Sequence, residues 1–454
     1  GTASFVGSNV AYSGSTVIAQ SVTVGGITLT GSAAGNYLFN SSATTTAKIT
    51  PAVLTISAAA ANKVYDGSNA ASVTLSNNAI SGAVNIGYTS ATFANASAAN
   101  GKVVTISGLS LSGASSANYT LNSVSSVTTS ANISPLGLTI TALDDSKVYG
   151  GSTTASGLVY VANAGNTTSS VTTANTNRFT VSGLLGSDAV TGLTFTSVGG
   201  LASSSVNGGP YTIIPSAPTG TGIGNYSITF VNGVMTVTKA SLTVSATAAD
   251  KVYNGSTTAI VTLTPIGVMA ADASAISVTY GSANFASKDV AYNATPAVTN
   301  QVVSISGIAL TGSAAANYVI SGGTTASASA KITPAPLTIT AAASDKVYDA
   351  TNTAAVTLTG NIINGDLITI NKTSATFASK DVAYISGAVA SQVVTVSGLT
   401  LSGAQAGNYS LASNSVTSSA TITPAPLSVA AAASDKVYDG STVATVALTV
   451  TGLK

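Results

Sequence analysis

Lys346-Val347-Tyr348-Asp349 is the stretch that decides how this chain is organised, because near-copies of it recur along the sequence. The tyrosines of the five copies are separated by 84, 104, 95 and 90 residues, and a second element, Asn followed by Tyr, recurs in step with them. Spacings of this size correspond to one small domain each and are too long for the coils of a solenoid. The tyrosines of the first element are Tyr65, Tyr149, Tyr253, Tyr348 and Tyr438, and those of the second are Tyr37, Tyr119, Tyr226, Tyr318 and Tyr409.

The two elements divide the 454 residues into four complete repeats and two partial ones. We expect repeat A at 51–134, repeat B at 135–238, repeat C at 239–333, repeat D at 334–423, an N-terminal segment at 1–50 and a C-terminal segment at 424–454. Repeat B is a sister type, because it reads Tyr149-Gly150 where the others read Tyr-Asp or Tyr-Asn. The partial repeats predict a window of a longer periodic protein; the alternative is that successive chains complete one another head to tail.

Each repeat contains short runs that alternate apolar and hydroxyl residues, such as Val73-Thr-Leu75 and Val103-Val104-Thr-Ile106. This period of two is typical of half-buried strands, and no amphipathic helix pattern competes with it. The sequence therefore predicts an all-β fold, a tandem array of small antiparallel, Ig-like β-sandwiches with six or seven strands each. Proline-containing joints such as Ile332-Thr-Pro334-Ala-Pro336 favour an extended path. We expect the array to form an elongated rod.

The composition excludes most catalytic and many binding functions. The chain has no His, Cys or Trp, and all 13 acidic residues are Asp, so the commonest groups for acid–base, thiol and zinc chemistry are missing. We expect no enzyme, no cofactor and no metal. Charged residues are 6% of the chain and the net charge is +1, which predicts neither nucleic acid nor anionic lipid as a partner. A mean hydropathy of +0.45 comes from Ala and Val, and no apolar window is long enough to enter a membrane.

The recurring tyrosines have a structural and a functional interpretation. A ring that recurs once per repeat at a turn is most simply buried, with its hydroxyl bonded to backbone. The Asn of the Asn-Tyr pair suits a turn before a strand, and the Tyr fills the core. The alternative is that these rings stack on a ligand.

A few polar residues suggest other chemistry, and each has a simpler explanation. Asp345 and Asp349, like Asp435 and Asp439, could hold calcium, but Asx-turns explain the same residues. A cross-link between Lys346 and Asn408 would need a buried acid that the sequence does not supply, so we expect Lys346 to keep a solvated ammonium on a packed stem. Asn-X-Ser/Thr patterns could accept glycans. Arg178 and Asp188 are the only unusual charges of repeat B.

The Lys63 to Gly67 and Lys436 to Gly440 stretches, together with Tyr149-Gly150 and the run Val231-Asn-Gly233 to Leu242, resemble the YDG and MBG repeats of filamentous-haemagglutinin-like bacterial surface adhesins. The resemblance implies a secreted, extracellular stalk of a Gram-negative cell without catalysis. It implies a structural fibre that acts through length, stiffness and self-association with copies along or beside it. The alternative is a polysaccharide-binding repeat module.

Overall fold

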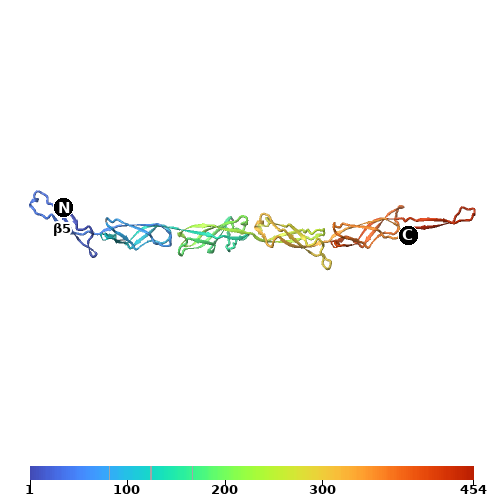
Figure 1. Ribbon diagram of the computed structural model, residues 1–454, viewed down its shortest axis with the longest axis horizontal. Coiled ribbons are helices and arrows are strands. Elements are labelled where there is room, and N and C mark those ends of the chain that lie inside the picture. The colour runs from blue at the N-terminus through green and yellow to red at the C-terminus, as the bar shows by residue number, and fades with distance from the viewer. Residues whose placement is uncertain (81, 123–124, 166) are drawn as a thin grey trace. The chain divides into compact units, whose positions relative to one another are not determined.

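The computed structural model describes residues 1–80, 82–122, 125–165 and 167–454, which form β-strands, loops and single-turn 3-10 helices. The chain divides into two compact units, Gly1–Thr238 and Lys239–Lys454. Within each unit, the strands of one repeat fold back on one another before the chain passes to the next repeat (Figure 1). No helix in the described part of the chain is long and apolar enough to cross a membrane.

The first unit contains the N-terminal segment, repeat A and repeat B. The N-terminal segment comprises β1 (Thr2–Phe5), β2 (Tyr12–Ser13), β3 (Thr16–Val17), β4 (Gln20–Gly25), η1 (Ala34–Asn36) and β5 (Ser42–Ala47). Repeat A comprises β6 (Ala52–Leu54), β7 (Ile56–Ala60), β8 (Lys63–Val64), β9 (Val73–Asn77), β10 (Asn85–Gly87), β11 (Ser90–Phe93), β12 (Ala99–Ser107), β13 (Ser110–Ser112), η2 (Ser116–Asn118), β14 (Tyr119–Leu121) and β15 (Ser126–Ser134). Repeat B comprises β16 (Leu136–Ala142), β17 (Asp145–Val148), β18 (Val161–Ala162), β19 (Ser169–Thr173), η3 (Thr176–Arg178), β20 (Phe179–Ser182), β21 (Ala189–Ser197), β22 (Tyr211–Thr221), η4 (Ile223–Asn225), β23 (Tyr226–Val231) and β24 (Gly233–Thr238).

The second unit contains repeat C, repeat D and the C-terminal segment. Repeat C comprises β25 (Ala240–Ala248), β26 (Lys251–Val252), β27 (Val261–Ile266), η5 (Ala270–Asp272), β28 (Ser277–Thr279), β29 (Ser282–Phe285), β30 (Gln301–Ser306), β31 (Ala309–Thr311), η6 (Ala315–Asn317), β32 (Tyr318–Ile320), β33 (Thr325–Ala330) and β34 (Ile332–Thr333). Repeat D comprises β35 (Ala335–Leu337), β36 (Ile339–Ala343), β37 (Lys346–Val347), β38 (Val356–Gly360), β39 (Thr369–Asn371), β40 (Ser374–Phe377), β41 (Tyr384–Ile385), β42 (Ala388–Val389), β43 (Ser391–Ser397), β44 (Thr400–Ser402), η7 (Ala406–Asn408), β45 (Tyr409–Leu411) and β46 (Ser415–Thr423). The C-terminal segment is the β47 (Ser428–Ala433) and β48 (Val446–Thr451) hairpin.

Each complete repeat is a two-layer sandwich, as the alternating patterns predicted. In repeat D one layer has the strand order β37-β46-β43-β40, and the other contains the pairs β36-β38, β35-β45 and β39-β44. Alternate residues of the central strand β43 point into the core, so Val394 and Val396 are fully buried while Val393 is exposed. Burying each such side chain contributes about 1.5–3 kcal/mol, which explains how small repeats without disulfides hold together.

The prediction of a purely antiparallel sandwich with six or seven strands is wrong in two respects. The strand that opens each repeat lies parallel to the strand that begins at the Asn-Tyr pair, as when Ala335 of β35 faces Tyr409 of β45. A parallel pair requires a long crossover, and the rest of the repeat supplies one. Short strands such as β39 and β44, which pair over three residues, add to the number of strands. A strand this short cannot show a period of two in the sequence.

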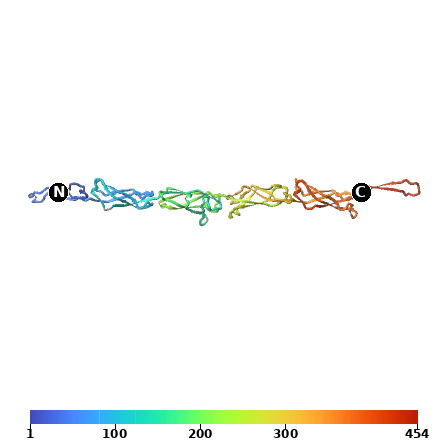
Figure 2. The same cartoon turned by 90° about the horizontal axis from the view of Figure 1, so that it is seen from below.

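The two terminal segments show what a repeat loses without its other layer. In the N-terminal segment only Val10 and Val22 are buried among the hydrophobic residues. Strands β47 and β48 are exposed on both faces along their whole length, and they form a lone hairpin in Figure 2.

Candidate functional site: the joint between consecutive repeats

The lysine of the Lys-Val-Tyr element closes the loop that follows it. In repeat D the Nζ atom of Lys346 donates to Oδ1 of Asp349 at 2.8 Å and to the carbonyl oxygens of Thr351 and Thr353 at 2.7 and 3.0 Å. It also lies 5.6 Å from the ring centroid of Phe377, a cation–π contact. Our expectation of a solvated ammonium is therefore wrong, because the loop supplies carbonyl acceptors that satisfy the charge. Asn408 is engaged elsewhere, as described below, which removes the idea of a Lys346–Asn408 cross-link.

The aspartate of the same element forms the Asx-turn that the sequence predicted. Oδ1 of Asp349 accepts from the backbone N–H of Thr351 at 2.9 Å, and Lys346 with these hydrogen bonds holds the pKa of Asp349 well below its usual range. The same arrangement surrounds Asp66 and Asp439. These carboxylates are occupied by a lysine and a turn, and the described residues contain no cluster of three metal-binding side chains.

Repeat B shows what happens when the aspartate is absent. Gly150 stands at its position, and the Nζ atom of Lys147 donates to the carbonyl of Gly151 at 3.0 Å. The Lys147 side chain is 3% exposed, and this burial lowers the pKa of Lys147 to about 8. The sister type of repeat therefore carries a lysine whose charge is poorly compensated.

In repeats A and C the tyrosine of the element contacts the next repeat. The hydroxyl of Tyr253, in repeat C, donates to Oδ2 of Asp366, in repeat D, at 2.9 Å. The hydroxyl of Tyr409, also in repeat D, donates to the same oxygen at 2.7 Å. The two rings pack edge to face with centroids 5.6 Å apart. One buried carboxylate thus joins two tyrosines from consecutive repeats.

The asparagine of the Asn-Tyr pair is the second contact of this joint. Oδ1 of Asn408, in repeat D, accepts from the backbone N–H of Val290, in repeat C, at 2.8 Å. Its Nδ2 atom donates to Oδ1 of Asp289 at 2.7 Å, and the hydroxyl of Tyr292 donates to the carbonyl of Gly407 at 2.7 Å. Both sides of one amide are used, which fixes its orientation and explains why Asn recurs here.

Lys288 adds a positive charge to the same joint. Its Nζ atom lies 3.0 Å from Oδ1 of Asp289, 3.3 Å from the hydroxyl of Tyr253 and 3.9 Å from Oδ1 of Asp366. These hydrogen bonds, chiefly the one to Asp289, raise the pKa of Lys288. The lysine therefore carries its charge at any ordinary pH and offsets the carboxylate that the two repeats share.

The joint between repeats A and B uses the same geometry with one difference. Tyr65 and Tyr226 donate to Oδ2 of Asp188 at 2.9 and 2.7 Å, and their rings pack edge to face at 5.5 Å. The backbone N–H of Ala98 donates to Oδ1 of Asn225 at 3.0 Å. Ala96 occupies the position equivalent to Lys288, so this carboxylate is held by hydroxyls without the lysine.

The N-terminal segment meets repeat A through the amide contact. The backbone N–H of Val10 donates to Oδ1 of Asn118 at 2.8 Å, Asn118 donates to Oδ1 of Asn9 at 2.8 Å, and Tyr12 donates to the carbonyl of Ala117 at 2.8 Å. Ala83 stands where repeats B and D have their aspartates. The amide contact is therefore common to all three of these joints, and the carboxylate is an addition to it.

The electrostatics of the joints favour neutral tyrosines. Burial raises the pKa of Tyr409 to about 12, and the hydrogen bond to Asp366 acts in the same direction. Burial likewise raises the pKa of Tyr226 and of Tyr253, and the hydrogen bond to Asp188 is the main cause for Tyr65. Each hydroxyl keeps its proton because that proton bonds the shared carboxylate.

The structure places the ten predicted tyrosines in three situations. The rings of Tyr65, Tyr149, Tyr253, Tyr226, Tyr318 and Tyr409 are buried, and Tyr119 and Tyr348 are half-buried. Tyr37 and Tyr438 are 68% and 93% exposed, contrary to the expectation of buried rings, because the strands that cover their counterparts in repeat D have no equivalent in 1–50 or 424–454.

The expected bond from the hydroxyl of the Lys-Val-Tyr tyrosine to backbone is wrong for Tyr65 and Tyr253. In the four complete repeats it is the hydroxyl of the Asn-Tyr tyrosine that bonds to backbone, where it accepts from a loop N–H, as Tyr409 does from Ile363 at 2.8 Å. The hydroxyls of Tyr65 and Tyr253 bind a carboxylate of the next repeat. The sequence analysis named Asp188 only as an unusual charge and missed Asp272 and Asp366. Each of these three aspartates lies three residues after the loop N–H that binds the tyrosine of its own repeat.

Arg178 and Asp188, the unusual charges of repeat B, belong to different sites. Asp188 lies in the joint, whereas Arg178 lines a cavity of about 10 Å³ together with Asp145 and Tyr160. The cavity has room for about one water molecule. No catalytic constellation joins the two residues.

The comparisons with known proteins bear on the repeats. The family model of the YDG domain matches residues 50–129, 238–328 and 333–417, which together are more than half of the chain. None of the curated proteins compared with the sequence matches it.

Among solved structures, the N-terminal eight Ig domains of Down Syndrome Cell Adhesion Molecule isoform 1.30.30 are similar over 89% of this chain, at 9% identity and a TM-score of 0.18. The chain spans 52% of that structure's length. The I9–I11 tandem from titin (62% of this chain, 98% of that one, 9% identity, TM-score 0.16) and Drosophila N-cadherin EC1-4 (80% and 98%, 7% identity, TM-score 0.19) are also similar. The matches to the family model show that the chain belongs to the YDG domain family.

Proposed function

We propose that this chain is a structural stalk or fibre segment of a secreted bacterial adhesin or extracellular matrix filament, at the cell surface or in the matrix. It acts through length, stiffness and self-association. The observation that carries the proposal is the joint of Tyr253, Asp366 and Tyr409, because it couples one repeat to the next through buried side chains. A linker of prolines alone would restrict the path of the chain without fixing neighbouring repeats against each other.

A stalk needs repeats that transmit orientation along the chain. Interfaces between domains within one chain allow motion by default unless specific contacts restrain them. Each of these joints contains an amide that is hydrogen-bonded on both sides, or a carboxylate shared by two tyrosines whose rings pack together, or both. These hydrogen bonds are directional. The amide contact that recurs in these joints thus supports a function in which neighbouring repeats of one compact unit hold each other.

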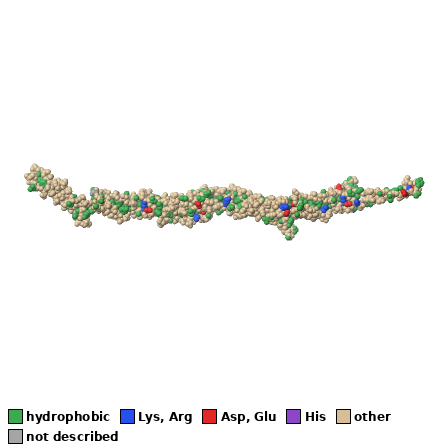
Figure 3. Space-filling model, viewed as in Figure 1, with side chains coloured by type: hydrophobic (Ala, Val, Ile, Leu, Met, Phe, Trp, Pro, Cys, Tyr) green, Lys and Arg blue, Asp and Glu red, His purple; other side chains and the backbone are tan. Residues whose placement is uncertain are grey.

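The surface of the repeats supports self-association beside the fibre. Lys and Asp side chains are few and lie close to one another on a surface that is mostly hydroxyl, amide and small apolar groups (Figure 3). Little net charge is available to keep parallel copies apart. Other copies of the chain are therefore the proposed partners.

Negative-stain electron microscopy of the chain, with antibody labelling of intact and permeabilised bacteria, tests the proposal. We expect extended particles whose length grows with the number of repeats, and labelling without permeabilisation. Compact particles, or labelling only after permeabilisation, would contradict the stalk and its extracellular location respectively.

Polysaccharide binding is the second candidate function. Tyr88 and Tyr280 are 43% and 39% exposed and occupy the same place, just before β11 and β29, in repeats A and C. Exposed rings can stack on sugars. Glycan-array binding that is lost in a Tyr88→Ala, Tyr280→Ala double variant would support this function. If the chain binds no glycan on the array, the structural stalk is the one proposed function that stands.

A further inference from the structure

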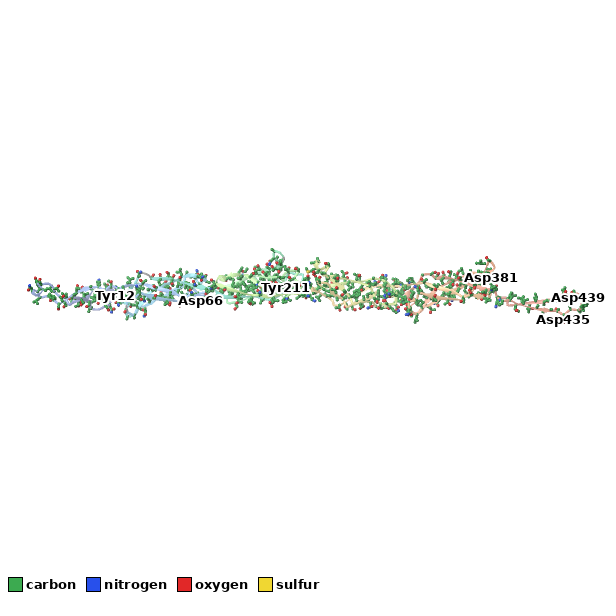
Figure 4. The ribbon with its side chains drawn as sticks, turned by 90° about the horizontal axis from the view of Figure 1, so that it is seen from above. Tyr12, Asp66, Tyr211, Asp381, Asp435 and Asp439 are labelled. Atoms are coloured by element: carbon green, nitrogen blue, oxygen red, sulfur yellow. The ribbon has the colours of Figure 1, made fainter. Side chains whose placement is uncertain are left out.

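Every complete repeat contains a second parallel pair, which joins the strand of the Lys-Val-Tyr element to the last strand of the repeat. In repeat D, Lys346 faces Ile422 and Val347 faces Thr423, and the backbone N–H of Tyr348 donates to the carbonyl of Thr423 at 2.8 Å. The equivalent pairs are β8 with β15, β17 with β24 and β26 with β34. Figure 4 shows Asp66, two residues after β8, at the end of repeat A where the chain leaves it. The pair thus lies where the chain leaves the repeat.

A side-chain oxygen extends this pair by one hydrogen bond in all four complete repeats. In repeat D, Oδ1 of Asp345 accepts from the backbone N–H of Thr421 at 2.6 Å. The hydroxyl of Thr423 adds a bond to the carbonyl of Lys346 at 3.3 Å. The acceptors of the equivalent backbone N–H in repeats A, B and C, at 2.7, 2.7 and 2.6 Å, are Asn62, Asp144 and Asp250. Asp345 therefore binds the last strand of its repeat, where the sequence suggested an Asx-turn.

The core of each repeat shields these hydrogen bonds from water. Ile422, which faces Lys346 in the pair, is fully buried. The residues at the same position of the other repeats are 0–3% exposed, and they are Ile133, Val237 and Ile332. Hydrogen bonds next to such a core are stronger than those in water, because no solvent competes for their donors and acceptors. The pair can therefore resist a force until its two strands move past each other.

The direction of the two strands decides how they respond to tension on the chain. Tension pulls β37 backwards from its N-terminal end, through the strands that open repeat D, and pulls β46 forwards from its C-terminal end. Because the two strands are parallel, these forces slide one strand along the other, and all hydrogen bonds between them carry the load together. Strands that are pulled apart from one shared end lose their bonds one after another. The opening pair of β35 with β45 is also parallel and is loaded in the same way.

We infer that the pair of the Lys-Val-Tyr strand with the last strand is a mechanical clamp, through which each complete repeat bears tension along the chain. In repeat D the clamp consists of residues 345–348 and 421–423. This function rests on the proposed stalk and deepens it, because a stalk is loaded from its two ends. Asp345 and its equivalents are the side chains of the clamp, and their oxygen adds one bond that must break before the strands can slide.

Optical tweezers with two pulling directions test the clamp on the full chain. The chain has no cysteine, so two introduced cysteines at exposed residues define where the DNA handles attach. Ser344→Cys with Pro426→Cys loads β37 and β46 from opposite ends, and Ser344→Cys with Ser419→Cys loads them from the same end. We expect repeat D to unfold at a severalfold higher force in the first direction when the loading rates are equal. Equal forces in the two directions would overturn the inference.

Asp345→Ala measures what the side chain adds to the clamp. Forced unfolding depends on the barrier to unfolding and not on equilibrium stability. If the clamp is that barrier, loss of the bond to Thr421 should raise the unfolding rate of repeat D, at a fixed force in the first direction, by about tenfold. Gln405→Ala is the matched control, because it removes a side-chain acceptor of a backbone N–H, that of Leu367, outside the clamp.

The unfolding rate of the control should equal that of the unsubstituted chain. A rate that Asp345→Ala leaves unchanged, or that Gln405→Ala raises equally, would overturn the clamp. The stalk and the clamp fail on different results. Extended particles in the electron microscope together with equal forces in the two directions would keep the stalk and remove the clamp, whereas compact particles would remove the stalk and with it the source of the tension.

Discussion

The hydroxyl of Tyr253 lies 2.9 Å from Oδ2 of Asp366, a residue 113 positions later in the next repeat. This bond changes what the recurring tyrosine does. It is a connection between repeats, where the sequence suggested a core residue of one repeat.

Asp366→Ala is expected to weaken the coupling of repeats C and D by about 2 kcal/mol, because it leaves two buried hydroxyls without their acceptor. Urea unfolding followed by circular dichroism should show the loss. A double-mutant cycle with Tyr253→Phe should give a coupling energy of about 1 kcal/mol or more. Tyr280→Phe, at an exposed ring of repeat C, is the control. Additive effects of the two substitutions would show that the bond contributes nothing.

Ala350→Gly should stabilise repeat D by about 1 kcal/mol, because Ala350 has φ of +67°, a left-handed conformation that costs an alanine about that much. Gly67 has φ of +77° at the equivalent position of repeat A, with no atom within 4 Å of the place that an added Cβ would take, so Gly67→Ala should destabilise by a similar amount. Thermal unfolding measures both changes. Ala355→Gly, at a residue without positive φ, should be neutral or destabilising; a gain there would point to a general effect of glycine.

Alkaline pH should loosen the joint between repeats C and D. The pKa of Tyr409 is raised from 10.0 to about 12 in the folded chain, so the folded state holds its proton more tightly than the unfolded state does. Stability is therefore full below pH 10 and is lost as the pH rises towards 12, by up to about 2 kcal/mol. Unfolding midpoints measured across this range should fall less steeply in Tyr409→Phe. Equal slopes would show that Tyr409 is exposed to solvent.

The stability of repeat B should rise with pH, whereas that of the joint between repeats C and D should fall. The pKa of Lys147 is lowered from 10.5 to about 8, so between these values the unfolded state binds more protons and stability rises with pH. Lys147→Met should stabilise repeat B by about 2–3 kcal/mol at neutral pH, with the gain shrinking as the pH rises. Hydrogen exchange of repeat B across pH checks this. A gain independent of pH would mean that packing alone is responsible.

Lateral association of the chains should depend weakly on salt. The net charge is +1 and charged residues are 6% of the chain, so screening has little repulsion to remove. Light scattering at increasing concentration and several salt concentrations measures the effect. Sharp dissociation by salt would show that ion pairs hold the copies together.

The repeats and their strands could be predicted because both are written into local patterns. Val394 and Val396 are separated by Thr395 and followed by Ser397, and that alternation follows from the geometry of a strand. The parallel pairing of β35 with β45 could not be predicted, because it joins residues far apart in the chain and leaves no local signature.

The joint was predicted only in part, because its contacts also join residues far apart in the chain. The tyrosines recur, and their recurrence is visible. Asp188 and Asp366 lie in loops of different sequence, and only the tertiary contact shows that both serve one role. In both repeats the aspartate lies three residues after the residue whose backbone N–H binds the tyrosine. This spacing can identify the aspartate only after that hydrogen bond is known.

The central claim, that side chains lock consecutive repeats, is tested most directly by a distance distribution across one joint. The chain has no cysteine, so Ser245→Cys on β25 and Thr357→Cys on β38, both exposed, accept one spin label each. Double electron–electron resonance should give one narrow distribution for this chain and a clearly broader one after Asp366→Ala and Asn408→Ala. A distribution that is broad from the start and unchanged by these substitutions would contradict the claim.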